Sequence, residues 1–315
     1  MYIRPKELKR ETAQMLGRQA YDPRKILLIY SAVSFGATLL AALIDMYLSG
    51  QSAQAGGLDG LQIRAVLATV SSILSLAISF LSPIWGLGLS FVLLRLARGE
   101  ETRPKDLTAG FRRFGRGIGL YFLTSLLALF VSFVAVYVGI LLMALLVNLD
   151  ELIKILAPFE QLIAENPALL EDPAFLSTLP WEPVISTMLL PLVLMILFIV
   201  GLSLAMSYLL RFAPYYIMDT PGVNPAFAII LSFRAVIKHF KTVLMLDLSN
   251  WWYFLLMLLI SSIPPLFLLL SGDAFGFLGD FLGQLACALG ACWLYWWKGP
   301  QVEATYALAY DKLKS

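Results

Sequence analysis

Long apolar segments alternate along this chain with short segments that carry most of its charges. A transmembrane helix needs roughly 20 consecutive apolar residues, so the pattern predicts membrane-spanning helices. We therefore expect an all-α polytopic membrane protein, built as one six-helix domain over residues 1–315. The predicted spans cover approximately residues 26–48, 65–97, 118–148, 183–212, 243–270 and 274–297.

Composition agrees with a membrane protein. Hydrophobic residues make up 59% of the chain and charged residues only 14%, whereas charged residues are about a quarter of a typical soluble domain. Helices are favoured in lipid because each one satisfies its own backbone N–H and C=O groups.

Two further segments are expected outside the lipid. Residues 2–18 place cations and apolar side chains at roughly helical spacing, which predicts an amphipathic helix on the membrane surface. Residues 149–182 form an acidic excursion, and its Asn-Pro, Asp-Pro and Glu-Pro pairs predict short helical turns.

Segment 220–241 is predicted to hold an amphipathic helix at the cytoplasmic surface. Asn224-Pro225 supplies an N-cap and a proline at the first helical position. We expect cations on one face and large apolar side chains on the opposite face, an arrangement that suits anionic lipid. The alternative is simple anchoring without a specific ligand. The cations are Arg234, Lys238 and Lys241, and the apolar residues are Phe227, Ile230, Leu231 and Ile237.

The distribution of cations predicts the topology. Of the 23 Lys and Arg residues, all except Arg64 and Lys154 fall in the N-terminus, the two basic loops, the span ends that face them, or the C-terminus. The positive-inside rule places these segments in the cytoplasm. We therefore expect both termini in the cytoplasm.

Ionisable side chains near apolar segments indicate a candidate binding site. Asp247 lies close to the start of the fifth span, where a carboxylate requires a cationic partner or a polar pocket. Arg211, His239 and Lys241 are the nearby cationic candidates. The full set of candidate ligand-binding residues is Arg211, Asp219, Arg234, Lys238, His239, Lys241, Asp247 and Asn250.

These residues also have a purely structural interpretation, in which Asp247 or Ser249 caps the fifth helix and Asp219 caps the turn before Pro221. His239 is the only histidine, so it provides neither a metal site by itself nor a Ser/His/Asp triad. Zinc-protease, P-loop and dinucleotide-binding motifs are absent from the sequence. We therefore expect no catalytic residue, no metal and no cofactor.

Small residues recur along the sixth predicted span. They allow helices to approach closely, either within one chain or between two copies. Packing within the chain is the favoured interpretation. The residues are Gly279, Gly283, Ala286 and Gly290.

Several segments carry a resemblance to a known family: KELKRETAQML near the start, DTP, NPAFAIILS, KHFK and LDLSNWW from the fourth span onward, and GPQVEATYALAYDKL at the end. Together they resemble an uncharacterised family of bacterial multipass membrane proteins, domain of unknown function 975. That family is related to the membrane domain of some glycerophosphodiester phosphodiesterases. The chain departs from it at Pro300-Gln301, where proline-tyrosine is commoner, and in the acidic excursion. The resemblance implies a six-helix cytoplasmic-membrane protein without established activity.

Three functions remain open at this point. The preferred one is non-enzymatic binding or transport of a lipid or another anionic amphiphile at the inner leaflet, where prolines in three spans (Pro83, Pro191, Pro264) favour broken helices around a cavity. The second is an accessory or scaffold subunit that docks a transporter or secretion complex. The least favoured is a membrane enzyme of phospholipid metabolism. Expected partners are anionic membrane lipids and, in the second case, a membrane protein; no nucleic acid is expected.

Overall fold

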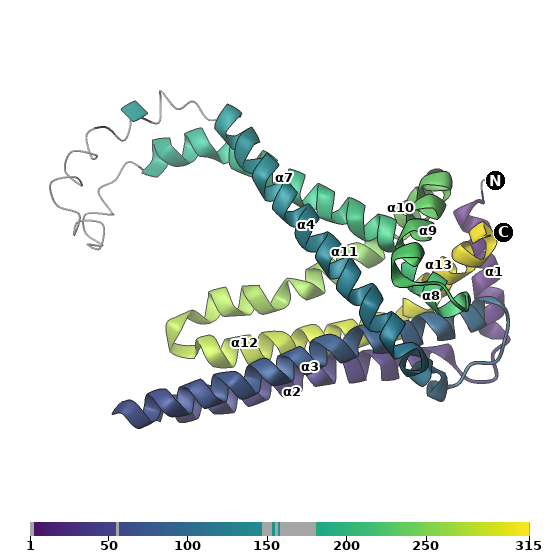
Figure 1. Ribbon diagram of the computed structural model, residues 1–315, viewed down its shortest axis with the longest axis horizontal. Helices are drawn as coiled ribbons and strands as arrows, with labels where there is room; N and C mark the ends of the chain where they lie inside the picture. The colour runs from purple at the N-terminus through teal and green to yellow at the C-terminus, as the bar shows by residue number, and fades with distance from the viewer. Residues whose placement is uncertain (1–2, 55–56, 147–152, 155–156, 158–180, 315) are drawn as a thin grey trace. The chain divides into compact units, whose positions relative to one another are not determined.

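A computed structural model describes residues 3–54, 57–146, 153–154, 157 and 181–314. All regular secondary structure in these residues is helical (Figure 1). The acidic excursion predicted at 149–182 lies almost entirely outside the described residues. The helices are α1 (Pro5–Gly17), α2 (Pro23–Gln54), α3 (Gly57–Ala97), η1 (Pro104–Arg113, a 3₁₀ helix), α4 (Phe114–Leu146), α7 (Trp181–Leu210), α8 (Ala213–Asp219), α9 (Pro225–Lys238), α10 (Phe240–Ser249), α11 (Trp251–Ser261), α12 (Ile263–Trp297) and α13 (Gly299–Lys314).

Several of these helices are suited to a membrane. Within the described residues, four helical segments are long and apolar enough to cross one, and a bent pair of helices makes up to five. The prediction of an all-α chain with several such helices is confirmed. The four segments, Pro23–Ile44, Leu76–Ala97, Pro104–Leu146 and Ile185–Asp219, overlap the first four predicted spans.

The chain divides into two compact units. The smaller unit, Thr124–Leu209, contains most of α4 and α7. These two helices are in close contact at Gly139, where an added Cβ atom would lie only 2.6 Å from Met195 Cγ. The larger unit, Met1–Leu123 with Leu210–Ser315, contains the remaining helices and all eight candidate residues.

The fifth predicted span, 243–270, is not one straight helix in the structure, because a break separates α10 from α11. α10 and the following helical segment meet at an angle of 63°, and Asn250 between them has φ −116° and ψ 11°. The break leaves the Ser249 carbonyl outside the helical ladder, and the Lys9 ammonium of α1 donates a hydrogen bond to it at 2.7 Å. A cation at the C-terminal end of a helix also interacts favourably with the negative end of the helix dipole.

The fold reverses direction within α12. α12 is assigned as helical from Ile263 to Trp297, but its start packs against its second half. The close approach is seen at Gly283, where an added Cβ atom would lie 2.9 Å from Pro264 Cα. Figure 1 shows this hairpin. Gly290 likewise contacts Ile260. The prediction that small residues serve packing within the chain is therefore confirmed at these two glycines.

Both ends of the chain meet at one end of the larger unit. α1 and α13 contact each other, and the two termini lie close together in Figure 1. Lys312 of α13 forms an ion pair with Glu11 of α1. α13, a helix not predicted from the sequence, is buried along most of its length. It packs between α1 and α3 and so organises the surrounding polar contacts.

Candidate functional site

Asp247 has the cationic partner that the sequence predicts, and the partner is Arg211. The Arg211 guanidinium and the Tyr306 hydroxyl both donate to Asp247 Oδ1. The guanidinium carbon also lies 4.6 Å from the centre of the Tyr306 ring and 5.6 Å from that of Phe254, in a cation–π arrangement. Asp247 therefore does not cap a helix: its carboxylate is half of a partly buried ion pair.

Asn250 is buried beside this pair. Only 2% of its surface is exposed, and its Nδ2 has no hydrogen-bond partner within the described part of the chain. Its backbone forms the break between α10 and α11, where its carbonyl accepts from the Tyr253 N–H at 2.9 Å. Asn250 thus has a clear structural role at the helix break.

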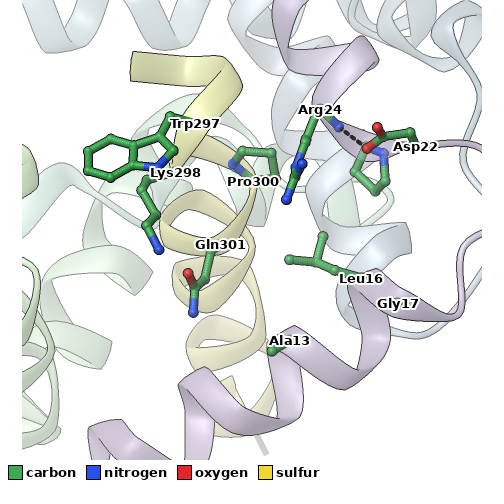
Figure 2. Close-up of a pocket in the computed structure, with 10 residues that line it drawn as sticks. Ala13, Leu16, Gly17, Asp22, Arg24, Trp297, Lys298, Pro300 and Gln301 are labelled. Atoms are coloured by element: carbon green, nitrogen blue, oxygen red, sulfur yellow. Dashed lines mark hydrogen bonds between the residues drawn. The ribbon is translucent and has the colours of Figure 1, made fainter. Parts of the chain in front are cut away.

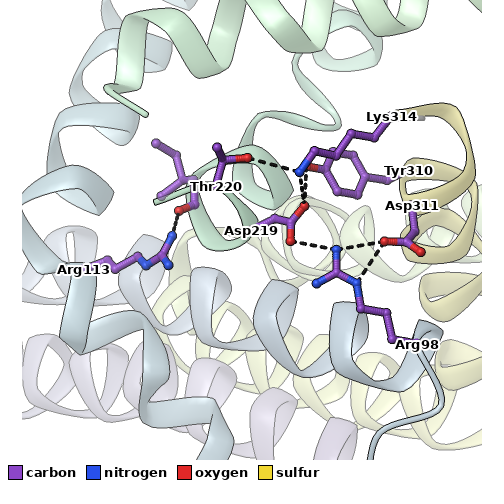
Figure 3. A network of polar contacts seen from close by, with 8 residues as sticks. Arg98, Arg113, Asp219, Thr220, Tyr310, Asp311 and Lys314 are labelled. Atoms are coloured by element: carbon purple, nitrogen blue, oxygen red, sulfur yellow. Dashed lines mark hydrogen bonds and ion pairs between the residues drawn. The ribbon is translucent and has the colours of Figure 1, made fainter. Parts of the chain in front are cut away.

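Asp219 lies in a second network, shown in Figure 3. Its carboxylate, with a side chain only 6% exposed, pairs with Arg98 at 2.7 Å and with Lys314 at 2.6 Å. The Tyr310 hydroxyl donates to the same carboxylate at 3.2 Å, and Arg98 also pairs with Asp311 at 2.8 Å. Asp219 is the last residue of α8, and its side chain joins that helix to α3 and α13.

α13 connects the two networks. Tyr306 and Tyr310 are four residues apart, so they share one face of the helix, and they contact Asp247 and Asp219 respectively. Glu303 lies one turn earlier and Lys314 one turn later on the same face. These residues were not among the eight predicted from the sequence. The spacing of 303, 306, 310 and 314 was the available signal, but nothing in it identified partners that lie 50 or more positions away.

The predicted two-faced character of α9 was wrong. Its buried face consists of small or short residues, Ala228, Ser232, Ala235 and Val236, and Ser232 Oγ accepts from the backbone N–H of Phe212 at 3.1 Å. Because short side chains let this face pack closely, the bulkier residues lie outside. The Asn224 side chain caps the helix through the Phe227 N–H at 2.7 Å, as predicted.

Cations and large apolar side chains consequently share the exposed side of α9 and the start of α10. Phe227, Ile230 and Ile237 are 46%, 45% and 65% exposed, and exposed Phe240 follows. Exposed cations are interspersed with them. We call this surface the α9 face; it comprises Phe227, Ile230, Arg234, Ile237, Lys238, Phe240 and Lys241.

The eight predicted residues therefore separate into groups with different roles. Arg211 and Asp219 already neutralise opposite charges within the protein, so neither is the primary contact for an external ion. His239 is buried at the junction of α9 and α10. Among the eight, Arg234, Lys238 and Lys241 remain exposed. Within the described residues, no three His, Cys, Asp or Glu side chains gather closely enough to hold a metal ion.

Glu303 is an acid whose environment favours its neutral form. It is only partly buried as a residue, but its carboxyl lies among aromatic side chains, with Oε1 3.5 Å from the Tyr253 hydroxyl. This burial raises the pKa of Glu303, although the Arg211 charge and the Tyr253 hydrogen bond act in the opposite direction.

We predict that Glu303→Gln makes the protein more stable at alkaline pH and less sensitive to pH. A raised pKa means that the folded state holds its proton more tightly, so this contribution is full at low pH and is lost as pH rises through the folded pKa. The check is thermal unfolding in detergent between pH 5 and 9, where wild type should lose stability more steeply than Glu303→Gln. Identical slopes in the two proteins would contradict the assignment.

The roles given above rest on the contacts within this chain. In comparisons with known proteins, no family model matches the chain, and neither does any curated protein or solved structure.

Proposed function

We propose that this protein binds an anionic amphiphile, such as a phospholipid, at the inner leaflet of a membrane without covalent chemistry. The observation that carries the proposal is the α9 face, where three exposed cations alternate with four exposed large apolar side chains. Apolar side chains enter the acyl boundary of a bilayer, while Lys and Arg extend to the phosphates. Each such cation contributes about 1 kcal/mol of attraction to an anionic surface.

We further propose six spans with both termini in the cytoplasm. Four spans correspond to the apolar segments of α2, α3, α4 and α7, the fifth to the bent α10–α11 pair, and the sixth to the returning half of α12. Support comes from the contact between α1 and α13, because an even number of crossings returns the chain to the side on which it began. Basic η1 packs on the end of α3 at the same side of the unit.

The proposal predicts that anionic lipid stabilises the protein through the α9 face. In neutral detergent, added phosphatidylglycerol should raise the Tm of wild type more than phosphatidylcholine does, because a ligand that binds only the folded state stabilises it by mass action. The triple variant Arg234→Glu/Lys238→Glu/Lys241→Glu should lose this difference, since three contributions of about 1 kcal/mol correspond to roughly 100-fold in affinity.

Lys154→Glu is the control. Lys154 is an exposed cation in the predicted acidic excursion, so its reversal should leave the lipid response intact. A triple variant that folds normally and keeps the full response to phosphatidylglycerol would refute the proposal. If neither protein responds to lipid, the accessory-subunit hypothesis takes its place.

A further inference from the structure

A pocket with charged and apolar lining residues lies where the C-terminal end of α1, the start of α2 and the junction of α12 and α13 meet, as Figure 2 shows. Its volume of about 360 Å³ falls in the range of small-ligand pockets. None of the eight residues predicted from the sequence lines it. The residues that line it include Arg24, Trp297, Lys298 and Gln301.

The charged groups of the pocket favour an anion. Arg24 and Lys298 supply a guanidinium and an ammonium, and Gln301 adds an amide. Asp22 is the only acid that lines it, and one of its carboxylate oxygens is engaged by the backbone N–H of Arg24 at 3.0 Å. Pro300 and Gln301 belong to the first turn of α13, where the helix dipole also attracts negative charge. In Figure 2 Arg24 lies on one side of Pro300, and Lys298 and Gln301 lie on the other.

A third cation adds to the positive field. The pKa of Lys9 lies below its ordinary value, first because the side chain is partly buried and second because the Lys298 ammonium is near. Two like charges this close are unfavourable unless an anion or solvent compensates them. The Lys9 ammonium is already bound to the Ser249 carbonyl, so Lys298 is the cation directed to the pocket.

The pocket also lies at the level expected for lipid head groups. The membrane-compatible segment of α2 begins at Pro23, which lines the pocket. Trp297 lines it as well, and its ring contacts the rings of Trp293 and Trp252, with centres 5.2 and 5.7 Å away. Clustered tryptophans are typical of the boundary between acyl chains and water.

We propose that this pocket binds a phosphate group, namely the phosphate of an inner-leaflet phospholipid, with Arg24, Lys298 and Gln301 as the donors. The inference rests on the proposed function and makes it more specific: the α9 face attracts the anionic surface, and the pocket binds one head group. A guanidinium matches two phosphate oxygens at once, and an ammonium adds a point charge. Trp297 covers the glycerol side of the head group.

The test is isothermal titration of the detergent-purified protein with three probes: inorganic phosphate, glycerol 3-phosphate and dihexanoyl phosphatidic acid. We expect saturable binding of phosphatidic acid, at least about tenfold weaker in Arg24→Gln/Lys298→Gln, since each charge-assisted hydrogen bond contributes more than 1 kcal/mol. The short-chain lipid should bind more tightly than glycerol 3-phosphate. Equal affinity for lipid and inorganic phosphate would identify free phosphate as the ligand and overturn the lipid assignment.

Two controls separate this inference from the proposed function. Lys25→Gln removes an exposed neighbouring charge that does not line the pocket, and it should bind phosphatidic acid like wild type. The ligand-free Tm of each variant reports whether it folds. If Arg24→Gln/Lys298→Gln folds and keeps wild-type affinity while the α9 triple variant loses its lipid response, the pocket assignment is wrong and the proposed function stands.

Discussion

Gly88→Ala is expected to prevent η1 from docking on α3. A Cβ atom at Gly88 would lie 1.7 Å from the backbone oxygen of Leu107, and one at Gly110 would lie 2.0 Å from the backbone oxygen of Ile84. The two backbones therefore touch through their glycines, and no side-chain rotation relieves the clash. Because overpacking commonly costs about 1–3 kcal/mol even when side chains can adjust, we expect a loss of at least about 3 kcal/mol here.

The measurement is thermal unfolding in detergent, together with the monodisperse fraction on size exclusion. Gly36→Ala is the matched control, because Gly36 is also in a membrane-compatible helix but has nothing within 4 Å of its Cβ position. There alanine should be neutral or stabilising by up to about 1 kcal/mol. Similar stability of Gly88→Ala and Gly36→Ala would show that η1 does not pack on α3 through these glycines.

Asp247→Ala is the second change with a large expected effect. It leaves the Arg211 guanidinium partly buried, without its carboxylate, at the end of an apolar helical segment. Removing one member of a buried ion pair costs about 3–5 kcal/mol, and the partial exposure of this pair places the expected loss near 3 kcal/mol. The Tyr306 hydroxyl loses its acceptor at the same time. The Tm in detergent measures this loss.

A double variant separates the cost of an unpaired charge from the cost of losing side-chain packing. Arg211→Met/Asp247→Leu removes both charges and should recover most of the stability that Asp247→Ala loses, because an apolar pair carries no unpaired ion. Asp311→Ala is the comparison for a more exposed pair: Asp311 contacts Arg98 with a third of its side chain exposed, so its loss should cost about 1 kcal/mol or less. Equal losses for Asp247→Ala and Asp311→Ala would contradict the special role of the Arg211 pair.

The membrane-compatible helices were predictable because length and hydropathy alone define them. The first four predicted spans overlap helices of the structure for this reason. The cationic partner of Asp247 was also predictable in kind, since an ionised carboxylate near an apolar segment needs compensation. Which of the three candidate cations pairs with Asp247 could not be predicted, because Arg211 lies 36 positions away in the sequence and only tertiary packing brings the two side chains together.

The errors have physical causes as well. The cations and the large apolar residues of α9 were predicted on opposite faces, but both lie on the exposed side, because close packing against the protein selects short side chains such as Ala228, Ser232 and Ala235 for the buried face. At the break beside Asn250, the Ser249 carbonyl accepts a hydrogen bond from Lys9, which lies 240 positions away in the sequence. The pocket lined by Arg24 and Lys298 is likewise formed by segments from the two ends of the chain, and only the fold brings them together.

Native mass spectrometry tests the central claim most directly. Wild type and Arg234→Glu/Lys238→Glu/Lys241→Glu would be released from nanodiscs that contain equal amounts of phosphatidylglycerol and phosphatidylcholine. We predict that wild type retains phosphatidylglycerol in clear preference and that the triple variant retains the two lipids equally or none. The same preference for phosphatidylglycerol in both proteins, or none in wild type, would contradict the assignment of the α9 face as a surface for anionic lipid.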